Sequence, residues 1–218
     1  ESAGSPDPRD EPAPRRPPRP QMTEGPIASI LIMALVGALY ICAMAASMSF
    51  FNLYMDRDLG VSTSRIGTII ACGQLLAVPV ALTMAGLARR IGYAAVFGCS
   101  AAGIALCTLP MGLLPEWWAA GAGVIGITVM SAIAFPAITV YQQELVEPDW
   151  RPIMSGAYMM AIALSWSVMA SAGGYLIQAQ GYRFLFLLGS GLSAAGVVVF
   201  TLYAVRRARL LAIAKVDS

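Results

Sequence analysis

Apolar residues are grouped along this chain into six long runs separated by short polar breaks. The runs cover about residues 27–55, 66–88, 93–114, 117–141, 153–178 and 184–205. Each is close to the roughly 20 residues that a helix needs to cross the hydrocarbon core of a bilayer. Apolar and polar residues do not alternate inside the runs, as they would in the strands of a membrane barrel. The pattern therefore predicts six transmembrane helices and an all-α integral membrane fold.

The composition agrees with a membrane protein and excludes several other classes. Hydrophobic residues make up 58% of the 218 residues, charged residues make up 12%, and the mean hydropathy is +0.70. A soluble domain carries about a quarter charged residues, so this chain lacks the residues to cover a water-facing surface. A soluble enzyme, a nucleic-acid binder and a disordered chain are thereby excluded. The net charge of +2 is also too small to indicate a polyanionic partner such as a nucleic acid.

The two ends of the chain differ from its middle. Residues 1–25 are rich in proline and charge, which predicts a disordered cytoplasmic linker. Residues 26–206 hold the six runs and predict the transmembrane bundle, and residues 207–218 are predicted to form a cytoplasmic tail. Because the chain begins with Glu1 rather than Met, we interpret its start as an internal cut in a longer protein.

The positive charges predict how the bundle sits in the membrane. With six spans, both tails and the second and fourth loops lie on one side. That side holds eleven cations: Arg9, Arg15, Arg16, Arg19, Arg89, Arg90, Arg151, Arg206, Arg207, Arg209 and Lys215. The other side holds three: Arg57, Arg65 and Arg183. Because cytoplasmic loops carry the excess of Lys and Arg, we expect a multi-pass protein of the cell membrane with both termini in the cytoplasm.

A weak internal repeat divides the runs into two groups of three. Gly92-Tyr93 opens the third run and Gly181-Tyr182 opens the sixth, an offset of 89 residues. Since three is an odd number, the second group crosses the membrane in the opposite sense to the first. This predicts two inverted three-helix repeats, an arrangement typical of secondary transporters. The alternative is a chance likeness between helices rich in glycine and alanine.

The second loop carries a recognisable motif. Segment Ala85–Gly92, with the sequence AGLARRIG, resembles the Gly-x-Leu-Ala-Asp-Arg-x-Gly signature of the major facilitator superfamily. The matching positions are Leu87, Ala88, Arg90 and Gly92, whereas Arg89 stands where the family has Asp. The stretches 147–156 and 173–186 are similar to the fourth loop, fifth span and sixth-span start of that family.

This resemblance implies the C-terminal six-helix half of such a transporter. The implied function is transport of a small, amphipathic solute by alternating access, with efflux as the favoured direction. The implied partners are the solute, the lipid bilayer and an N-terminal six-helix half outside this chain. The alternative is a non-transporting or degenerate half that acts as a membrane scaffold or through a partner.

In this family the first helix of each three-helix unit lines the cavity, which points to the first and fourth runs. Each has one helix face with polar, aromatic or sulfur-containing side chains at spacings of three and four residues. The candidate cavity residues are Tyr40, Met44, Ser47 and Phe51 in the first run, and Thr128, Ser131, Phe135 and Thr139 in the fourth. The alternative is that each hydroxyl simply bonds the carbonyl one turn back in its own helix.

The residue types argue against chemistry at this site. The chain has no histidine, and every Asp, Glu, Lys and Arg lies in a break, in a tail or at the end of a run. An intramembrane enzyme needs a histidine, a metal cluster or acidic residues at depth. We therefore expect neither an enzyme nor a metal or cofactor site, and we expect any coupling carboxylate to lie outside this segment.

Overall fold

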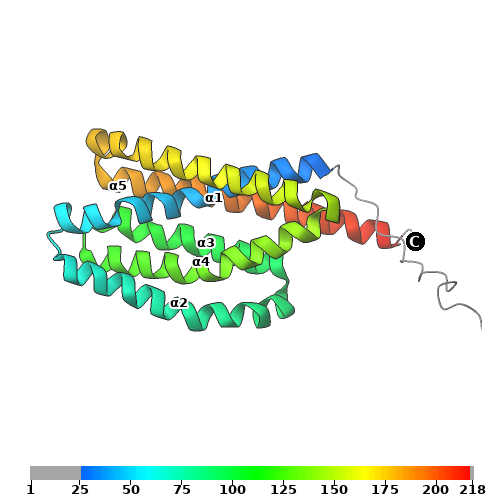
Figure 1. The fold of residues 1–218 in the computed structure, drawn as a ribbon, viewed down its shortest axis with the longest axis horizontal. Coiled ribbons are helices and arrows are strands. Elements are labelled where there is room, and N and C mark those ends of the chain that lie inside the picture. Colours follow the sequence, from blue (N-terminus) through cyan, green and yellow to red (C-terminus); the bar gives the residue numbers. More distant parts are fainter. Residues whose placement is uncertain (1–25, 217–218) are drawn as a thin grey trace, which may run out of the picture.

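The computed structural model describes residues 26–216. Within this range the chain is helical apart from short turns, and it contains no strand. The long helices run roughly side by side along one axis (Figure 1). They are α1 (Pro26–Leu53), α2 (Thr63–Ile91), α3 (Tyr93–Leu113), α4 (Trp117–Leu145) and α5 (Arg151–Val216), with a π-helical turn at Tyr54–Asp58 and a 3-10 turn at Pro148–Trp150. All five are long and apolar enough to cross a membrane, which confirms the prediction of an all-α membrane fold.

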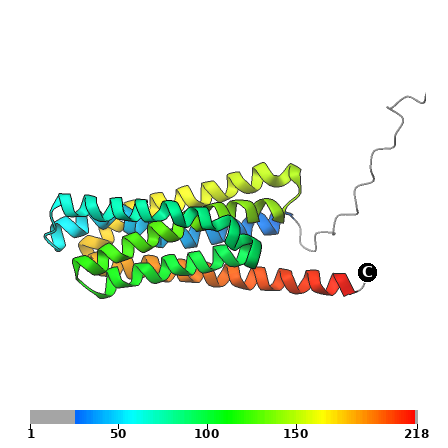
Figure 2. The same ribbon diagram turned by 90° about the horizontal axis from the view of Figure 1, so that it is seen from below.

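Helix α5 consists of two arms. It comprises 66 residues, which as a straight rod would be about 100 Å long at the helical rise per residue. Gly181 has φ 81° and ψ 173° in its middle, and there the chain reverses direction (Figures 1 and 2). We call residues 151–180 the first arm and residues 182–216 the second arm. The sequence predicted a polar break of several residues between the last two runs. In the structure only Gly181 departs from helical geometry there.

Several helices extend beyond the apolar runs that predicted them. Helix α2 was expected over 66–88 but begins at Thr63 and ends at Ile91. The second arm of α5 continues to Val216, so the tail expected at 207–218 begins inside a helix. The added residues include Ala, Leu and Arg, which are good helix formers. The predicted linker 1–25 and the last residues, 217–218, lie outside the described residues.

Gly92 and Gly181 adopt the same unusual backbone conformation. Gly92 has φ 84° and ψ 154°, close to the values at Gly181, and this region of backbone space is essentially restricted to glycine. Gly92 ends α2, and its N–H donates to the carbonyl of Ala88 at 2.9 Å. The two turns lie at opposite ends of the bundle (Figure 1). The Gly-Tyr repeat of the sequence therefore corresponds to a repeated turn.

This conformation leads to a prediction about alanine at the two turns. Gly92→Ala and Gly181→Ala should each destabilise the protein by about 1–3 kcal/mol, because a Cβ makes a positive φ costly. Thermal unfolding in detergent or nanodiscs measures the change. Gly86→Ala is the matched control, since a Cβ at helical Gly86 meets nothing within 4 Å and alanine favours the helix. Equal stability of all three variants would show that the turns tolerate a side chain.

The first helix of each predicted unit packs on helices of the other unit. Helix α1 packs mainly on α5, and α4 packs mainly on α2 and α3. Glycines mark these close approaches. The ring of Tyr158 lies over Gly37, that of Phe50 over Gly173, the side chain of Met111 over Gly123, and the backbone of Tyr40 against Gly196. The two halves of the bundle are therefore interleaved, and the small residues set how near the helices come.

Two small residues one turn apart on the second arm of α5, Gly191 and Ala195, do not form a helix contact. A Cβ at Gly191 meets nothing within 4 Å, and Ala195 is exposed, so the Gly191-xxx-Ala195 pattern faces outward. The second arm instead contacts α1 through Gly189 and Gly196, while Ser193 Oγ donates to the carbonyl of Tyr40 at 2.9 Å. Spacing alone identifies a small-residue face but not the direction in which it points.

The cations gather at the two ends of the bundle as the topology requires. Arg89, Arg90, Arg151, Arg206, Arg207 and Arg209 lie at the end shared by the α2–α3 turn, the α4–α5 turn and the end of α5. Arg57, Arg65 and Arg183 lie at the opposite end. Arg183 there donates from Nε to the carbonyl of Gly112 at 2.9 Å and from Nη2 to that of Leu113 at 3.1 Å. The assignment of the richer end to the cytoplasm stays a prediction.

Candidate functional site

A hollow of about 260 Å³ lies halfway along the bundle, between α1, α2 and α4. We call it the central hollow. It is lined by Met44 of α1, Gln74 and Ala77 of α2, and Thr128, Ser131, Ala132, Phe135 and Pro136 of α4. Four of the eight predicted cavity residues are thus brought together. The lining combines apolar surface with a few polar groups, which is the usual composition of a small-molecule site.

The two hydroxyls of the central hollow are bonded to their own helix. Thr128 Oγ1 donates to the carbonyl of Val124 at 2.8 Å, and Ser131 Oγ donates to the carbonyl of Thr128 at 2.8 Å. This confirms the alternative interpretation of these residues, although it does not remove them from the lining. A hydroxyl that has donated its proton keeps its acceptor capacity. Toward the hollow both oxygens therefore act as acceptors.

Pro136 adds a backbone acceptor to the same surface. Proline has no N–H, so the carbonyl four residues earlier loses its helical donor. That residue is Ala132, and both Ala132 and Pro136 line the hollow. A proline inside a helix usually kinks it, and α4 continues through Pro136 from Trp117 to Leu145. The proline's contribution to the site is that the Ala132 carbonyl, one helical turn earlier, receives no N–H from position 136.

Gln74 supplies the donors that the rest of the lining lacks. Its amide lies on the exposed side of α2 and forms no hydrogen bond within the described part of the chain. A glutamine amide has two N–H donors and one acceptor. From the sequence, Gln74 is interpreted as a structural amide that bonds across helices, because α2 was not expected to line the cavity. The sequence feature that could have identified Gln74 as a lining residue is that it is a lone amide within an otherwise apolar run.

Most of the predicted face of α1 belongs to the core. Tyr40, Ser47 and Phe51 are fully or almost fully buried, and of the predicted α1 residues only Met44 lines the central hollow. The ring of Tyr40 contacts Phe97 of α3 edge-on, with ring centroids 5.3 Å apart. The reason is that α1 lies against both arms of α5, so its faces are covered by protein. On this helix the aromatic spacing reflects packing within the bundle, and a solute contact for these three residues stays a prediction.

Thr139 continues the predicted face of α4 but lies outside the central hollow. Its side chain is exposed, and its Oγ1 donates to the carbonyl of Phe135 at 2.8 Å. Phe135 itself lies between the hollow and the core, with its ring centroid 6.3 Å from that of Tyr40. Three of the four candidate residues of α4 therefore line the central hollow. A solute contact for any of them stays a prediction.

A second hollow continues the same groove toward the end that holds Arg57 and Arg65. It measures about 510 Å³ and is lined by Ser49, Asn52, Leu53, Asp56, Thr63, Ile66, Gly67 and Ile70. On α2, the lining positions of both hollows fall on one helix face, from Thr63 through Ile70 to Ala77. The two hollows thus form a track between α1 and α2, and the only ionisable side chain on it is Asp56.

The central hollow has no charged side chain in its lining. Among residues 26–216 there is also no group of three His, Cys, Asp or Glu side chains that could hold a metal ion. The site can therefore bind through shape, apolar contact and hydrogen bonds, and it has no counter-charge for an ion.

Comparison with known proteins identifies the family. A sequence profile described as Major Facilitator Superfamily matches residues 33–215, most of the chain. The chain belongs to the major facilitator superfamily. Two uncharacterized MFS-type transporters, of Burkholderia mallei (strain SAVP1) and Burkholderia pseudomallei (strain K96243), are each 29% identical to it over 166 residues. That alignment covers 74% of this chain and 39% of each relative, so the chain spans well under half of their length.

The superfamily motif lies at the end of α2 rather than in a loop. Residues 85–91 are helical, and only Gly92 forms the turn to α3. Ala88 is buried, whereas Leu87 and Arg90 are exposed. The two arginines in the last turn face the negative end of the helix dipole, which favours them there. Superfamily membership and the long apolar helices together make this a multi-pass membrane protein of a transport family.

Proposed function

We propose that this chain is the C-terminal half of an alternating-access transporter and that the central hollow is its part of the solute site. The observation that carries the proposal is the lining of this hollow, where polar groups of α2 and α4 meet apolar side chains halfway along the bundle. Superfamily membership supports transport as the function class.

The hydrogen-bonding groups of the hollow favour a neutral solute that carries donors. The hydroxyls of Thr128 and Ser131 face it as acceptors, the carbonyl of Ala132 is a further acceptor, and Gln74 can either donate or accept. An ion would lose its hydration without gaining a counter-charge, which is unfavourable. Met44 and Phe135 offer apolar surface to the remainder of the molecule. A small amphipathic solute with one or two N–H or O–H groups fits this lining.

Inverted repeats and six spans are part of the same proposal. The two arms of α5 would cross the membrane separately. Support comes from the matching turns at Gly92 and Gly181, which lie at opposite ends of the bundle. Further support comes from Gly103 and Gly196, since the first approaches Met130 of α4 and the second approaches Tyr40 of α1. Equivalent helices of the two units thus make equivalent contacts.

The proposed partner is an N-terminal six-helix half that closes the central hollow. The hollow is lined by three helices of this chain, and Gln74 and Cys72 of α2 are exposed. The relatives are more than twice as long as the aligned part. We expect both termini in the cytoplasm, location in the cell membrane, and efflux as the direction of transport.

Thiol labelling tests alternating access without knowledge of the solute. In a cysteine-free background, Thr128→Cys expressed together with the partner half should react with a charged methanethiosulfonate reagent from either side of the membrane. The reactive thiolate needs water, which a cavity that opens to both sides supplies. Membrane vesicles of the two orientations give the two rates.

The matched control is Ile133→Cys, on the same helix and buried at 7% exposure, which should stay unreactive. Labelling of Thr128→Cys from one side alone would indicate a fixed cavity and favour the scaffold alternative. Equal labelling of both variants would show that the face of α4 is not a water-filled surface.

A further inference from the structure

The second hollow differs from the central hollow because it carries a carboxylate. Asp56 lines it together with three neutral polar side chains, Ser49, Asn52 and Thr63, and the other lining residues are apolar or glycine. None of them lines the central hollow. The two hollows lie in one groove but differ in charge, so a cation that the central hollow disfavours finds a counter-charge in the second.

The backbone around Asp56 is the π-helical turn Tyr54–Asp58 at the end of α1. Its first two residues, Tyr54 and Met55, are buried in the core, and the N–H of Val61 donates to the carbonyl of Met55 at 2.9 Å. Asp56 itself is exposed and lines the hollow. Short π-helical turns occur frequently at functional sites. This turn anchors its first residues in the bundle and presents the Asp56 carboxylate to the second hollow.

The three arginines at this end of the bundle interact with other groups or lie on other faces. Arg183 is bonded to two carbonyls at the end of α3. Arg65 lies about 200° around α2 from Thr63, on the face away from the hollow. Arg57 lies close enough to a tyrosine at the start of the second arm of α5 to act on it electrostatically. Within residues 26–216, none of the three forms an ion pair with Asp56.

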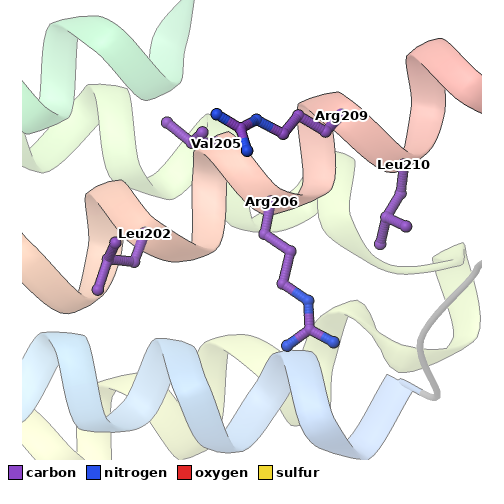
Figure 3. Close-up of a pocket in the computed structure, with 5 residues that line it drawn as sticks. All are labelled: Leu202, Val205, Arg206, Arg209 and Leu210. Carbon is purple, nitrogen blue, oxygen red and sulfur yellow. The ribbon is translucent and has the colours of Figure 1, made fainter.

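The other described arginines lie at the opposite end of the bundle. Arg206 and Arg209, which Figure 3 shows on the second arm of α5, belong to that end. Helix α1, which runs between the two ends, has 28 residues and is therefore about 42 Å long at the helical rise per residue. This is several times the screening length of about 8 Å at physiological ionic strength. The charge of Asp56 is therefore available to a cationic ligand.

We propose that the second hollow binds a primary alkylammonium cation. The ammonium group has three N–H donors, which the carboxylate of Asp56, the amide oxygen of Asn52 and the neighbouring hydroxyls accept. The alkyl chain lies against the apolar part of the wall, formed by Leu53, Ile66 and Ile70. This part of the wall distinguishes the alkylammonium from an inorganic cation, which would gain nothing from it. The proposal concerns equilibrium binding and depends neither on transport nor on the solute of the central hollow.

Equilibrium binding of hexylammonium tests the proposal. The full chain is placed in nanodiscs of phosphatidylcholine, a lipid without net charge, and binding is measured by calorimetric titration. Empty nanodiscs correct for partition of the amine into lipid. The wild type should bind hexylammonium saturably and more tightly than hexanol, its uncharged analogue. Asp56→Asn should weaken hexylammonium binding about fivefold, the upper end for an exposed ion pair, and should leave hexanol binding unchanged.

The matched control is Asp58→Asn, in the same π-helical turn. It removes the same charge, but Asp58 is exposed and does not line the second hollow, so this variant should keep most of the affinity. An equal decrease in both variants would show that hexylammonium responds only to the general charge of this end, and it would overturn the proposal. Equal affinity of the wild type for hexylammonium and hexanol, or the absence of saturable binding, would overturn it as well.

Salt provides a second readout that needs no folded variant. Raising the ionic strength from about 0.01 M to about 0.15 M shortens the screening length from about 30 Å to about 8 Å, so hexylammonium binding to the wild type should weaken while hexanol binding should not. At fixed ionic strength, sodium chloride and tetramethylammonium chloride should give the same hexylammonium affinity. Displacement of hexylammonium by sodium alone would identify a site for an inorganic cation and contradict the proposal.

Discussion

Gly196→Leu should destabilise the bundle by about 3 kcal/mol, the upper end of the usual cost of overpacking a core. Even a single added Cβ at this position would lie 2.9 Å from the Cβ of Leu39 and 2.9 Å from the backbone nitrogen of Tyr40. Backbone atoms cannot rotate away as the end of a side chain can. The second arm of α5 would have to separate from α1, with loss of the hydrogen bond from Ser193 Oγ to the carbonyl of Tyr40. Thermal unfolding in nanodiscs and protease resistance both report this change.

Gly191→Leu is the matched control for this substitution. It lies on the same arm, five residues earlier, and a Cβ there meets nothing within 4 Å. We expect it to change the unfolding free energy by less than about 0.5 kcal/mol, as surface substitutions usually do. If the two variants were equally stable, α1 and the second arm would not be in the close contact described above.

Ser131→Leu should raise the apparent KM for transport about tenfold or more with little loss of expression. Ser131 lines the central hollow, whose volume is about 260 Å³, and leucine would fill part of it and remove one acceptor. A change of one methylene in a binding pocket is already worth about 10- to 200-fold in specificity. Vesicle flux with the complete transporter, measured over a range of solute concentrations, separates KM from kcat.

Thr139→Leu serves as the control because it makes the same kind of change on the same predicted face. Thr139 is exposed and lies outside the hollow. Its transport kinetics should match the wild type. A KM that rises equally in both variants would place the solute elsewhere on α4, and unchanged kinetics in Ser131→Leu would remove the central hollow from the solute path.

The sequence predicted the helices well because bilayer thickness constrains them directly. Each apolar run became a helix, or an arm of α5, at nearly the expected position. The boundaries were wrong where helices continue past the apolar region, as α2 does to Ile91. Hydropathy identifies the residues that lie within the hydrocarbon core, whereas a helix ends where the backbone dihedral angles leave the helical region. For α2 that point is Gly92, whose positive φ ends the helix.

The site could be predicted only in part, since periodicity does not say what covers a face. On α4 the spacing selected Thr128, Ser131 and Phe135, which line the central hollow. On α1 the same spacing selected Tyr40 and Ser47, which are buried. The difference depends on tertiary contacts: α1 lies between both arms of α5. No local pattern near Tyr40 encodes a contact with a segment some 150 residues away.

Interleaved packing has a consequence for how the protein is made. The contact between Tyr40 and Gly196 joins residues separated by 156 positions of the chain. At a synthesis rate of 5–20 residues per second, roughly 8–30 s pass between their emergence from the ribosome. During that interval α1 is already in the membrane without the helix that covers it. Its buried hydroxyls, such as those of Ser47 and Tyr40, would then face lipid or insertion machinery. Newly inserted α1 should therefore depend on contact with a membrane chaperone until the second arm of α5 covers it. We expect cellular quality control to recognise α1 when that packing fails.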